Sequence, residues 1–216
     1  MKSLVIAACA AFVLSAQDRS VPIDNDQVKV LKVTQGPHIK TSLHKHDMNR
    51  VMIYLQAGTQ TIEYQGAKTA HLKWKAGEPL WSPAGGMHIA EITSANKVTI
   101  VELELKKPGV KGAVKQPALD PVKIDPKHYK VELDNEQVRV IRAKIGGKQV
   151  APMHEHGLNR VVVYLTDQNF RVTSAEGKVD LAQHKAGDVS WGTPTKHMEE
   201  NLSDSLFEIL VVELKN

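Results

Sequence analysis

The sequence predicts an all-β protein made of two similar halves. Short runs of residues alternate between polar and apolar side chains, which is typical of half-buried strands. Turns that contain glycine separate these runs, and a long stretch of the first half is repeated in the second. No segment carries a sustained apolar helical stripe. Many short strands with regular turns indicate a sandwich or a barrel.

The predicted strands follow one another in the same order in both halves. The runs of the first half are "QVKVLKV" (27–33), "RVMIYL" (50–55) and "VTIVELEL" (98–105). The matching runs of the second half are "QVRVIRA" (137–143), "RVVVYL" (160–165) and "FEILVVELK" (207–215). Val, Ile and Leu must supply most of the core, because aromatic residues make up only 5% of the chain.

The repeat has a nearly constant spacing. "VPIDNDQVKVLKVTQG", from Val21, aligns with "VELDNEQVRVIRAKIGG", from Val131, at an offset of 110 residues (131 − 21). One residue is missing after Trp191, so the offset falls to 109 near the end of each half. The aligned pairs are His44 with His154, His46 with His156, Arg50 with Arg160, Tyr54 with Tyr164, Gly77 with Gly187 and His88 with His197. The repeat therefore predicts a tandem duplication.

A proline-rich segment joins the two halves. Its sequence, "KKPGVKGAVKQPALDPVKIDPKHYK", has four prolines, two glycines and no apolar periodicity, as expected where a chain turns or connects. It is rich in lysine but has no interleaved aromatic residues, so we interpret it as a solvated linker. We predict a first domain at 17–117 and a second at 118–216.

The first residues have the pattern of a secretory signal peptide. Lys2 provides a positive start, an apolar run follows from Leu4 to Leu14, and small residues precede Gln17. We predict that residues 1–16 are removed by cleavage after Ala16 and that the protein is periplasmic or secreted. The apolar run is too short to span a bilayer as a lone anchor, so no membrane anchor is expected.

The predicted mature chain excludes several classes of protein. Its one cysteine, Cys9, lies within the predicted signal peptide, so neither disulfides nor a Cys-His nucleophile are expected. Without Lys2 the chain has 27 basic and 24 acidic residues, and a net charge near +3 is too small to indicate a nucleic-acid partner. No phosphate-binding glycine loop and no nucleophile elbow can be recognised.

Each half carries two histidines separated by one residue. On a strand, residues i and i+2 share a face about 6.6 Å apart, so His44 and His46 direct both imidazoles to one point. His88, which follows the turn "SPAGGMH", can supply a third ligand from another strand. The matching histidines of the second half are His154, His156 and His197. Three neutral imidazoles predict a divalent transition metal (Fe, Zn, Ni, Mn or Cu) with open positions for water or substrate.

These motifs resemble those of the cupin superfamily. A His-x-His pair followed later by "GEPLWSPAGGMH" is similar to its two motifs, and Gly77, Pro83, Gly85 and His88 match the second motif. The duplication makes the chain resemble a bicupin, and "DNDQVKV" with "DNEQVRV" resembles small bacterial cupins of the β-alanine degradation type. The resemblance covers nearly all of the predicted mature chain. It implies two tandem jelly-roll (double-stranded β-helix) barrels.

Both halves depart from the metal-binding cupin pattern at one position. The glutamate that usually follows the histidine pair is Arg50 in one half and Arg160 in the other. Arginine stays charged and cannot ligate a metal. Two accounts are open: the guanidinium binds the carboxylate of an acidic substrate, or it pairs with an inward acid such as Glu199. Strand parity places Tyr54 and Tyr164 on the same face, where each is either a substrate contact or a core residue.

The third histidine of the second half follows a different turn. "GTPTKH" is one residue shorter than "SPAGGMH" and lacks the paired glycines, so we expect His197 to reach the common point less well than His88. Asn201 lies four residues after His197, as the family's second motif leads us to expect. The first half is therefore the preferred metal site. The histidines without a partner in the other half are interpreted as surface or loop residues: His38, His71, His128 and His184.

Two functions from different classes fit these residues. Three-histidine iron sites in cupins often perform oxygenase chemistry, so the resemblance implies a metal-dependent, dioxygenase-like enzyme. Its substrate would be a small anionic molecule, such as a carboxylate, held by Arg50 or Arg160. The alternative is a non-catalytic periplasmic module that binds a small ligand or a metal, because no residue stands out as a general acid or base. Exposed barrel edges also allow a homodimer.

Overall fold

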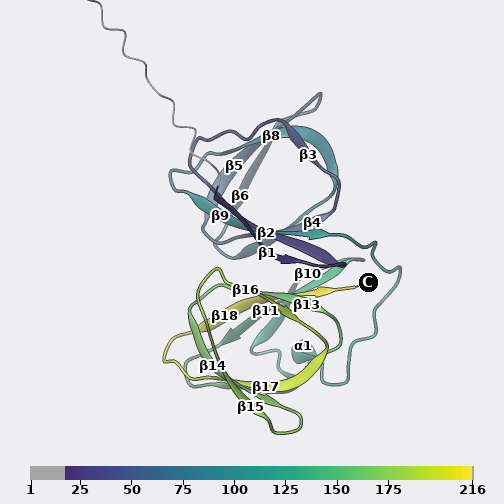
Figure 1. The fold of residues 1–216 in the computed structure, drawn as a ribbon, viewed down its shortest axis with the longest axis vertical. Helices are drawn as coiled ribbons and strands as arrows, with labels where there is room; N and C mark the ends of the chain where they lie inside the picture. Colours follow the sequence, from purple (N-terminus) through teal and green to yellow (C-terminus); the bar gives the residue numbers. More distant parts are fainter. Residues whose placement is uncertain (1–17, 216) are drawn as a thin grey trace, which may run out of the picture.

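The computed structural model describes residues 18–215, which form two β-barrels joined by a linker (Figure 1). The predicted signal peptide, residues 1–16, lies outside the described residues. Within the described range, the regular structure is strand apart from one short helix, α1 (Pro121–Ile124). None of the helical structure described is long and apolar enough to cross a membrane.

The first barrel consists of two antiparallel sheets. Its strands are β1 (Asp18–Asp24), β2 (Val28–Gln35), β3 (His44–His46), β4 (Arg50–Tyr54), β5 (Gly58–Tyr64), β6 (Ala70–Trp74), β7 (Glu78–Ser82), β8 (Gly85–Ile92) and β9 (Val98–Leu105). The five-stranded sheet has the order β1-β2-β9-β4-β7, and the four-stranded sheet has the order β3-β8-β5-β6. Strands distant in sequence are therefore neighbours, which is the arrangement of a jelly roll.

The second barrel repeats this topology strand for strand. Its strands are β10 (Tyr129–Asp134), β11 (Val138–Ile145), β12 (Val150–His156), β13 (Arg160–Tyr164), β14 (Gln168–Ser174), β15 (Val179–His184), β16 (Val189–Gly192), β17 (Thr195–Asn201) and β18 (Phe207–Leu214). The orders are β10-β11-β18-β13-β16 and β12-β17-β14-β15. The predicted all-β class and the tandem jelly-roll barrels are confirmed.

The two five-stranded sheets lie back to back between the barrels, and the four-stranded sheets form the outer walls (Figure 1). One apolar cluster fills the space between the barrels, and its fully buried members include Val30, Val51, Leu103, Val140, Val161 and Val212. The opposite faces of the same sheets line the two barrel interiors. This double burial explains why β4 and β13 are almost continuously apolar.

The turns that carry the motif glycines touch the opposite barrel. Gly77 and Gly187 have φ angles of +71° and +88°, a conformation that favours glycine. A Cβ atom on Gly77 would lie 2.8 Å from the side chain of Leu165 in the other barrel. The carbonyl of Gly77 accepts a hydrogen bond from Arg142, and that of Gly187 accepts one from Lys32, the residue aligned with Arg142. The barrels are thus related by an approximate twofold axis.

Candidate metal centres

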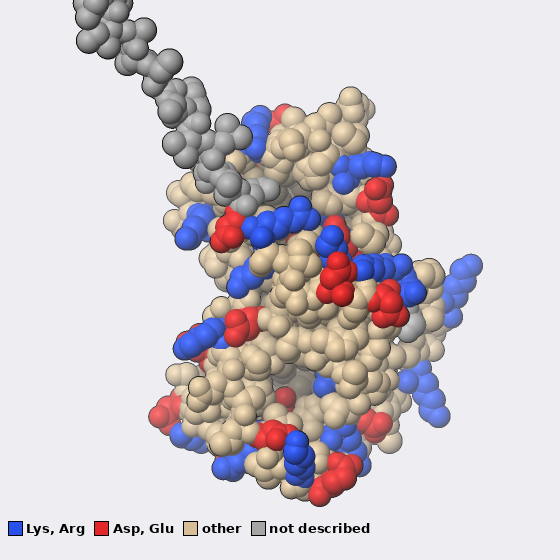
Figure 2. Space-filling model, viewed as in Figure 1, with Lys and Arg blue, Asp and Glu red and all other residues tan. Residues whose placement is uncertain are grey.

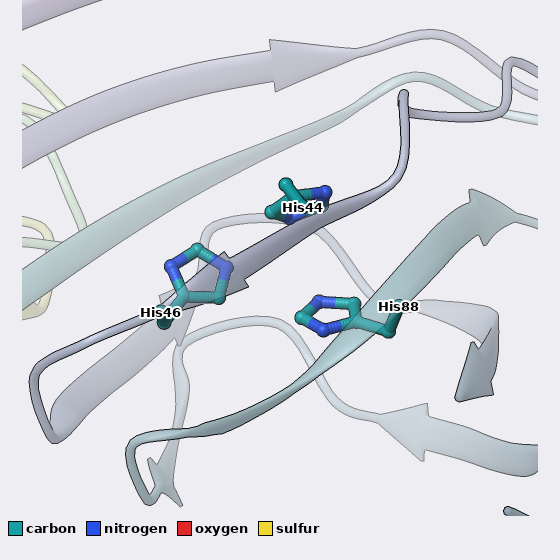
Figure 3. A group of neighbouring side chains, drawn as sticks. All are labelled: His44, His46 and His88. Carbon is teal, nitrogen blue, oxygen red and sulfur yellow. The ribbon is translucent and has the colours of Figure 1, made fainter. Parts of the chain in front are cut away.

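Three histidines meet inside the first barrel. His44 and His46 come from β3, and His88 comes from the neighbouring strand β8 (Figure 3). His44 and His88 are direct partners in the ladder, which brings their side chains to the same face. One ring nitrogen of each histidine lies within 4.8 Å of the others. The predicted convergence of these side chains is therefore present.

The second barrel assembles the same group from the same strands. His154 and His156 lie on β12, and His197 is the ladder partner of His154 on β17. Their ligand atoms also lie within 4.8 Å of one another. The expectation that the shorter turn keeps His197 away was therefore wrong. All three rings of this group are buried, whereas His44 and His46 are half-buried.

Hydrogen bonds to backbone carbonyls orient three of the six rings. His44, His88 and His154 each place Nδ1 2.8–2.9 Å from the carbonyl oxygen two residues earlier in the chain. A carbonyl only accepts, so Nδ1 carries a proton, and in the neutral ring Nε2 then keeps its lone pair. This is the tautomer that a metal requires when it binds through Nε2.

The second histidine of the His-x-His pair, His46 or His156, has different partners in the two barrels. Nε2 of His46 accepts a hydrogen bond of 2.8 Å from Arg50, because a guanidinium can only donate. Burial first, and then the positive charge of Arg50, lower the pKa of His46 to about 3. In the second barrel, Nδ1 of His156 donates to the Glu213 carboxylate at 2.9 Å, which leaves Nε2 unoccupied.

Arg50 is held by partners from its own barrel. It donates to Glu102 at 3.2 Å and to Ser82 at 2.8 Å in addition to His46, while its buried Nε has no hydrogen-bond partner. Burial raises the pKa of Glu102, and the charge of Arg50 opposes this shift. Of the two accounts of the arginine, the first barrel matches pairing with an internal acid, but the acid is Glu102 instead of Glu199.

Arg160 is in a different situation. Its one hydrogen bond goes to the backbone carbonyl of Thr193, and no carboxylate lies within 4.0 Å of it among residues 18–215. It is only 7% exposed. Arg160 lines a cavity of about 320 Å³ together with His156, His197 and Glu199. Figure 2 shows the second barrel hollowed in this view, with an acidic and a basic side chain inside the hollow.

Two residues beside the second histidine group were not predicted to be part of a metal centre. Glu199 places one carboxylate oxygen 3.5 Å from Nε2 of His197, and Tyr129 donates to the other oxygen at 3.4 Å. The Tyr129 hydroxyl also lies 3.4 Å from Nε2 of His154. Burial by itself raises the pKa of Glu199, but the hydrogen bond with His197 and the charges of the histidines outweigh it and lower the pKa to about 2.

The sequence contained a signal for Glu199 but not for Tyr129. Glu199 follows His197 by two residues, so strand alternation places both side chains on one face. The sequence indicated Glu199 only as a partner for an arginine. Tyr129 aligns with Arg19 in the first half, and this difference hides it from a comparison of the repeats. Arg19 and Tyr129 each line the cavity of their own barrel.

The predicted tyrosines line the two cavities. Tyr54 faces a cavity of about 430 Å³ in the first barrel and stacks on Trp74 with ring centroids 3.9 Å apart. Tyr164 faces the cavity of the second barrel and stacks on His184 at 3.8 Å. Each ring is therefore fixed by an aromatic neighbour at the cavity wall.

Two other polar residues have structural contacts. The side-chain amide of Asn201 donates to the carbonyls of Ile145, Gly146 and Ser205, so it braces a loop. His128 lies in the turn before β10, as predicted for a loop residue, but it is buried and not on the surface, and it bonds to Asp125 at 2.7 Å and to Gln149 at 3.0 Å.

The second barrel offers the better set of metal ligands. Three imidazoles meet at one point, and the Glu199 carboxylate lies beside them, 3.5 Å from Nε2 of His197. His154 and His156 both have Nδ1 engaged and Nε2 available. Nitrogen and carboxylate donors in this combination fit a divalent transition metal. In the first barrel, Arg50 occupies Nε2 of His46 and adds a positive charge. The sequence favoured the first half as the metal site, whereas these contacts favour the second.

Comparisons with known proteins concern the fold. No family model matches the chain, and no curated protein sequence matches it. Among solved structures, AerE from Microcystis aeruginosa is 9% identical over 88% of each chain, with a TM-score of 0.63. A Bacillus subtilis oxalate decarboxylase structure, described for its Mn(II) centres, is 13% identical over 89% of this chain and 70% of its own, with a TM-score of 0.62. Both likenesses extend across the two barrels.

Proposed function

We propose that this chain, which has the fold of a bicupin, is an exported metal-dependent enzyme that acts on a small carboxylate in its second barrel, with dioxygenase-like chemistry. One observation carries the proposal. Arg160 is buried at the cavity that holds His156, His197 and Glu199, and in the described part of the chain no carboxylate lies within 4.0 Å of it.

A buried cation that no carboxylate contacts directly favours an anionic ligand, and Glu199 and Glu213 act on the pKa of Arg160 only through their charges. Arginine stays charged, and its planar fork matches a carboxylate with two parallel hydrogen bonds. Removing the charge from water is costly, and a bound anion offsets that cost. Arg50 already has Glu102 as a counter-ion, so the same argument does not extend to the first barrel.

The residues that would hold the metal are His154, His156, His197 and Glu199. When bound, a divalent metal supplies a Lewis acid and, if it is redox-active, a site for oxygen chemistry. Arg160 would orient the carboxylate of the substrate, and Tyr129 can hold a proton between Glu199 and the ligand cavity. The Mn(II)-containing oxalate decarboxylase gives a structural precedent for a divalent metal and a carboxylate substrate in this fold.

Analysis of the metal content tests which barrel binds the divalent ion. Protein purified without chelator or histidine tag would be measured by mass spectrometry beside the matched variants His44→Ala and His154→Ala. We expect close to one divalent ion per chain, retained in His44→Ala and lost in His154→Ala. Loss of the ion only in His44→Ala would refute the assignment to the second barrel.

Ligand binding and turnover test the role of the arginine. Calorimetric titration of Mn(II)-loaded protein with oxalate as the probe is expected to lose about 10- to 100-fold in affinity on Arg160→Ala, the range for a charged hydrogen bond. Arg50→Ala is the matched control and should change this affinity little. Oxygen consumption or product formation with a panel of small carboxylates then separates the enzyme from the non-catalytic module, which binds without turnover.

A further inference from the structure

A buried chain of charged residues connects the linker with the second metal centre. Glu213 accepts a hydrogen bond from His156 through one oxygen, and its other oxygen lies 3.5 Å from Arg139. Arg139 donates through both terminal nitrogens to Asp120 of the linker, at 2.5 and 3.0 Å. The exposed fractions of these four residues are between 1% and 6%. The chain is therefore shielded from water along its whole length.

The linker also contacts the strand that carries two of the histidines. The backbone N–H of Glu155, between His154 and His156, donates to the carbonyl of Leu119 at 2.9 Å. β12 is an edge strand of its sheet, so this bond lies on the side that has no neighbouring strand. Gln116 accepts a further hydrogen bond from Arg139 at 2.7 Å. The linker segment 116–120 thus touches both the strand and the charged chain.

We propose that Arg139 is a positioning residue for the second metal centre, and that linker segment 116–120 acts on this centre through it. Arg139 and Asp120 hold the Glu213 carboxylate where it accepts from Nδ1 of His156. This fixes the tautomer that leaves Nε2 of His156 unprotonated and directed at the metal. The inference rests on the proposed metal site of the second barrel.

The charges in this chain explain why arginine is needed. Asp120 and Glu213 are two buried acids that Arg139 contacts together, so its charge offsets their mutual repulsion. A carboxylate only accepts hydrogen bonds, and this forces the proton of His156 onto Nδ1. An amide at position 213 could either donate or accept, and the tautomer would no longer be fixed.

The first barrel provides a natural comparison. Lys29 aligns with Arg139, and Glu104 aligns with Glu213. Within the described residues, Nδ1 of His46 has no hydrogen-bond partner, and Nε2 of this ring accepts from Arg50 instead. The first barrel, which has Lys29 in place of Arg139, is therefore the barrel in which Nε2 of the corresponding histidine, His46, is not free.

Nitrogen NMR of histidine tests the proposal directly. Metal-free protein labelled with ¹⁵N-histidine gives long-range ¹H–¹⁵N patterns that identify each tautomer, and the signals that disappear in His156→Gln assign this ring. We expect His156 to carry its proton on Nδ1 in the wild type. Arg139→Met should produce a mixture of tautomers, whereas the matched variant Lys29→Met should leave the pattern of His156 unchanged.

A metal titration completes the test. The Kd for Mn(II), followed by EPR, should rise about 10- to 100-fold in Arg139→Met, the usual effect of losing a partner of a ligating histidine. Arg139→Lys should recover part of this loss. If Arg139→Met does not fold, Glu213→Gln replaces it in both measurements, because it keeps the shape of the side chain. We expect the same change of tautomer and the same rise in Kd. An unchanged tautomer in a folded Arg139→Met or Glu213→Gln variant overturns the proposal.

The two proposals can fail separately. If the tautomer of His156 changes in Arg139→Met but the wild type binds no divalent ion, the positioning role stands and the proposed metal function fails. If the wild type binds the ion and Arg139→Met changes neither the tautomer nor the Kd, the metal function stands and the positioning role fails.

Discussion

The two barrels share a scaffold but place an inward-facing acid at different positions. Glu102 on β9 of the first barrel aligns with Val211 in the second, and Glu199 on β17 of the second aligns with Ala90 in the first. Glu102 neutralises the arginine of its barrel, whereas Glu199 contacts a histidine. The three histidines and the arginine are thus common to both barrels, but this acid contacts the arginine in one and a histidine in the other.

This difference shows how little sequence change separates two kinds of site. When the acid pairs with Arg50, the guanidinium is compensated inside the protein and one histidine nitrogen is occupied. When the acid pairs with the histidine group, the centre gains a negative charge and Arg160 has no carboxylate within 4.0 Å among the described residues. Duplication preserved the packing between the barrels and left the interior of each free to diverge.

Removing the acid of the first barrel should have the largest effect on stability. Glu102→Ala leaves Arg50 as a buried charge without a counter-ion, and we expect a loss of about 3–5 kcal/mol in the free energy of unfolding. Urea unfolding followed by circular dichroism measures it. The double variant Arg50→Met with Glu102→Leu should recover most of the loss. A cost below about 1 kcal/mol for Glu102→Ala would contradict the role of this pair, because exposed pairs contribute only that much.

Removing the acid of the second barrel should act on metal binding. Glu199→Ala deletes a charged oxygen beside His197, and we expect the Kd for Mn(II) to rise more than about 100-fold, beyond the effect of losing a partner of a ligand. Calorimetric titration measures the Kd, and Glu102→Gln is the control that should leave it unchanged. Equal effects of the two variants would show that the second barrel is not the binding site.

The fold could be predicted from the sequence because it depends on repeated local signals. Strand alternation and glycine turns appear in both halves at a spacing of 110 residues, so each half supports the interpretation of the other. The six histidines could be found for the same reason, since His-x-His fixes a common face wherever a strand forms. Even the shorter turn before His197 did not disturb this geometry.

The partners of the charged residues could not be predicted from the repeat. Glu102, Glu199 and Tyr129 each lack an equivalent in the other half, so alignment of the halves gives them no weight. Arg139 lies on β11 and reaches the site only through Glu213, a contact that depends on how the sheets pack. Strand alternation predicts which face of the sheet a side chain occupies. It does not predict which charged side chain on that face becomes its partner, because this depends on distances in the folded protein.

The two acids should respond to pH in opposite directions. The pKa of Glu199 falls from 4.5 to about 2 on folding, so the stability it contributes is complete above pH 4.5 and is lost as the pH falls from 4.5 toward 2. Burial raises the pKa of Glu102 in the folded state, so the folded protein is less stable with this carboxyl group ionised than with it protonated, and that difference disappears as the pH falls through its folded-state value.

Thermal unfolding of the metal-free protein between pH 7 and pH 3 compares these two contributions. We expect Glu199→Gln to flatten the loss of stability in acid, because the group that binds a proton on unfolding is gone. Glu102→Gln should steepen the loss, because it removes a residue whose protonation favours the folded state. Parallel melting curves for the two variants would contradict the opposite environments of these carboxyl groups.

The smallest expected effect lies where the barrels are most alike. The side-chain amide of Asn49 donates to Gln137 of the second barrel, and Asn159 donates to Gln27 of the first, at 2.5 and 2.6 Å. Each hydrogen bond contributes about 1 kcal/mol to stability. Asn49 also accepts from the N–H of Ala84, and no described residue gives Asn159 an equivalent bond.

The two asparagine variants should therefore differ slightly. We expect Asn159→Ala to lower the free energy of unfolding by about 1 kcal/mol and Asn49→Ala by about 2 kcal/mol, since the latter loses two hydrogen bonds. Urea unfolding measures both, and both should leave the Kd for Mn(II) unchanged because they lie between the barrels. A larger loss for Asn159→Ala would mean that the twofold relation between these contacts does not govern how the barrels hold together.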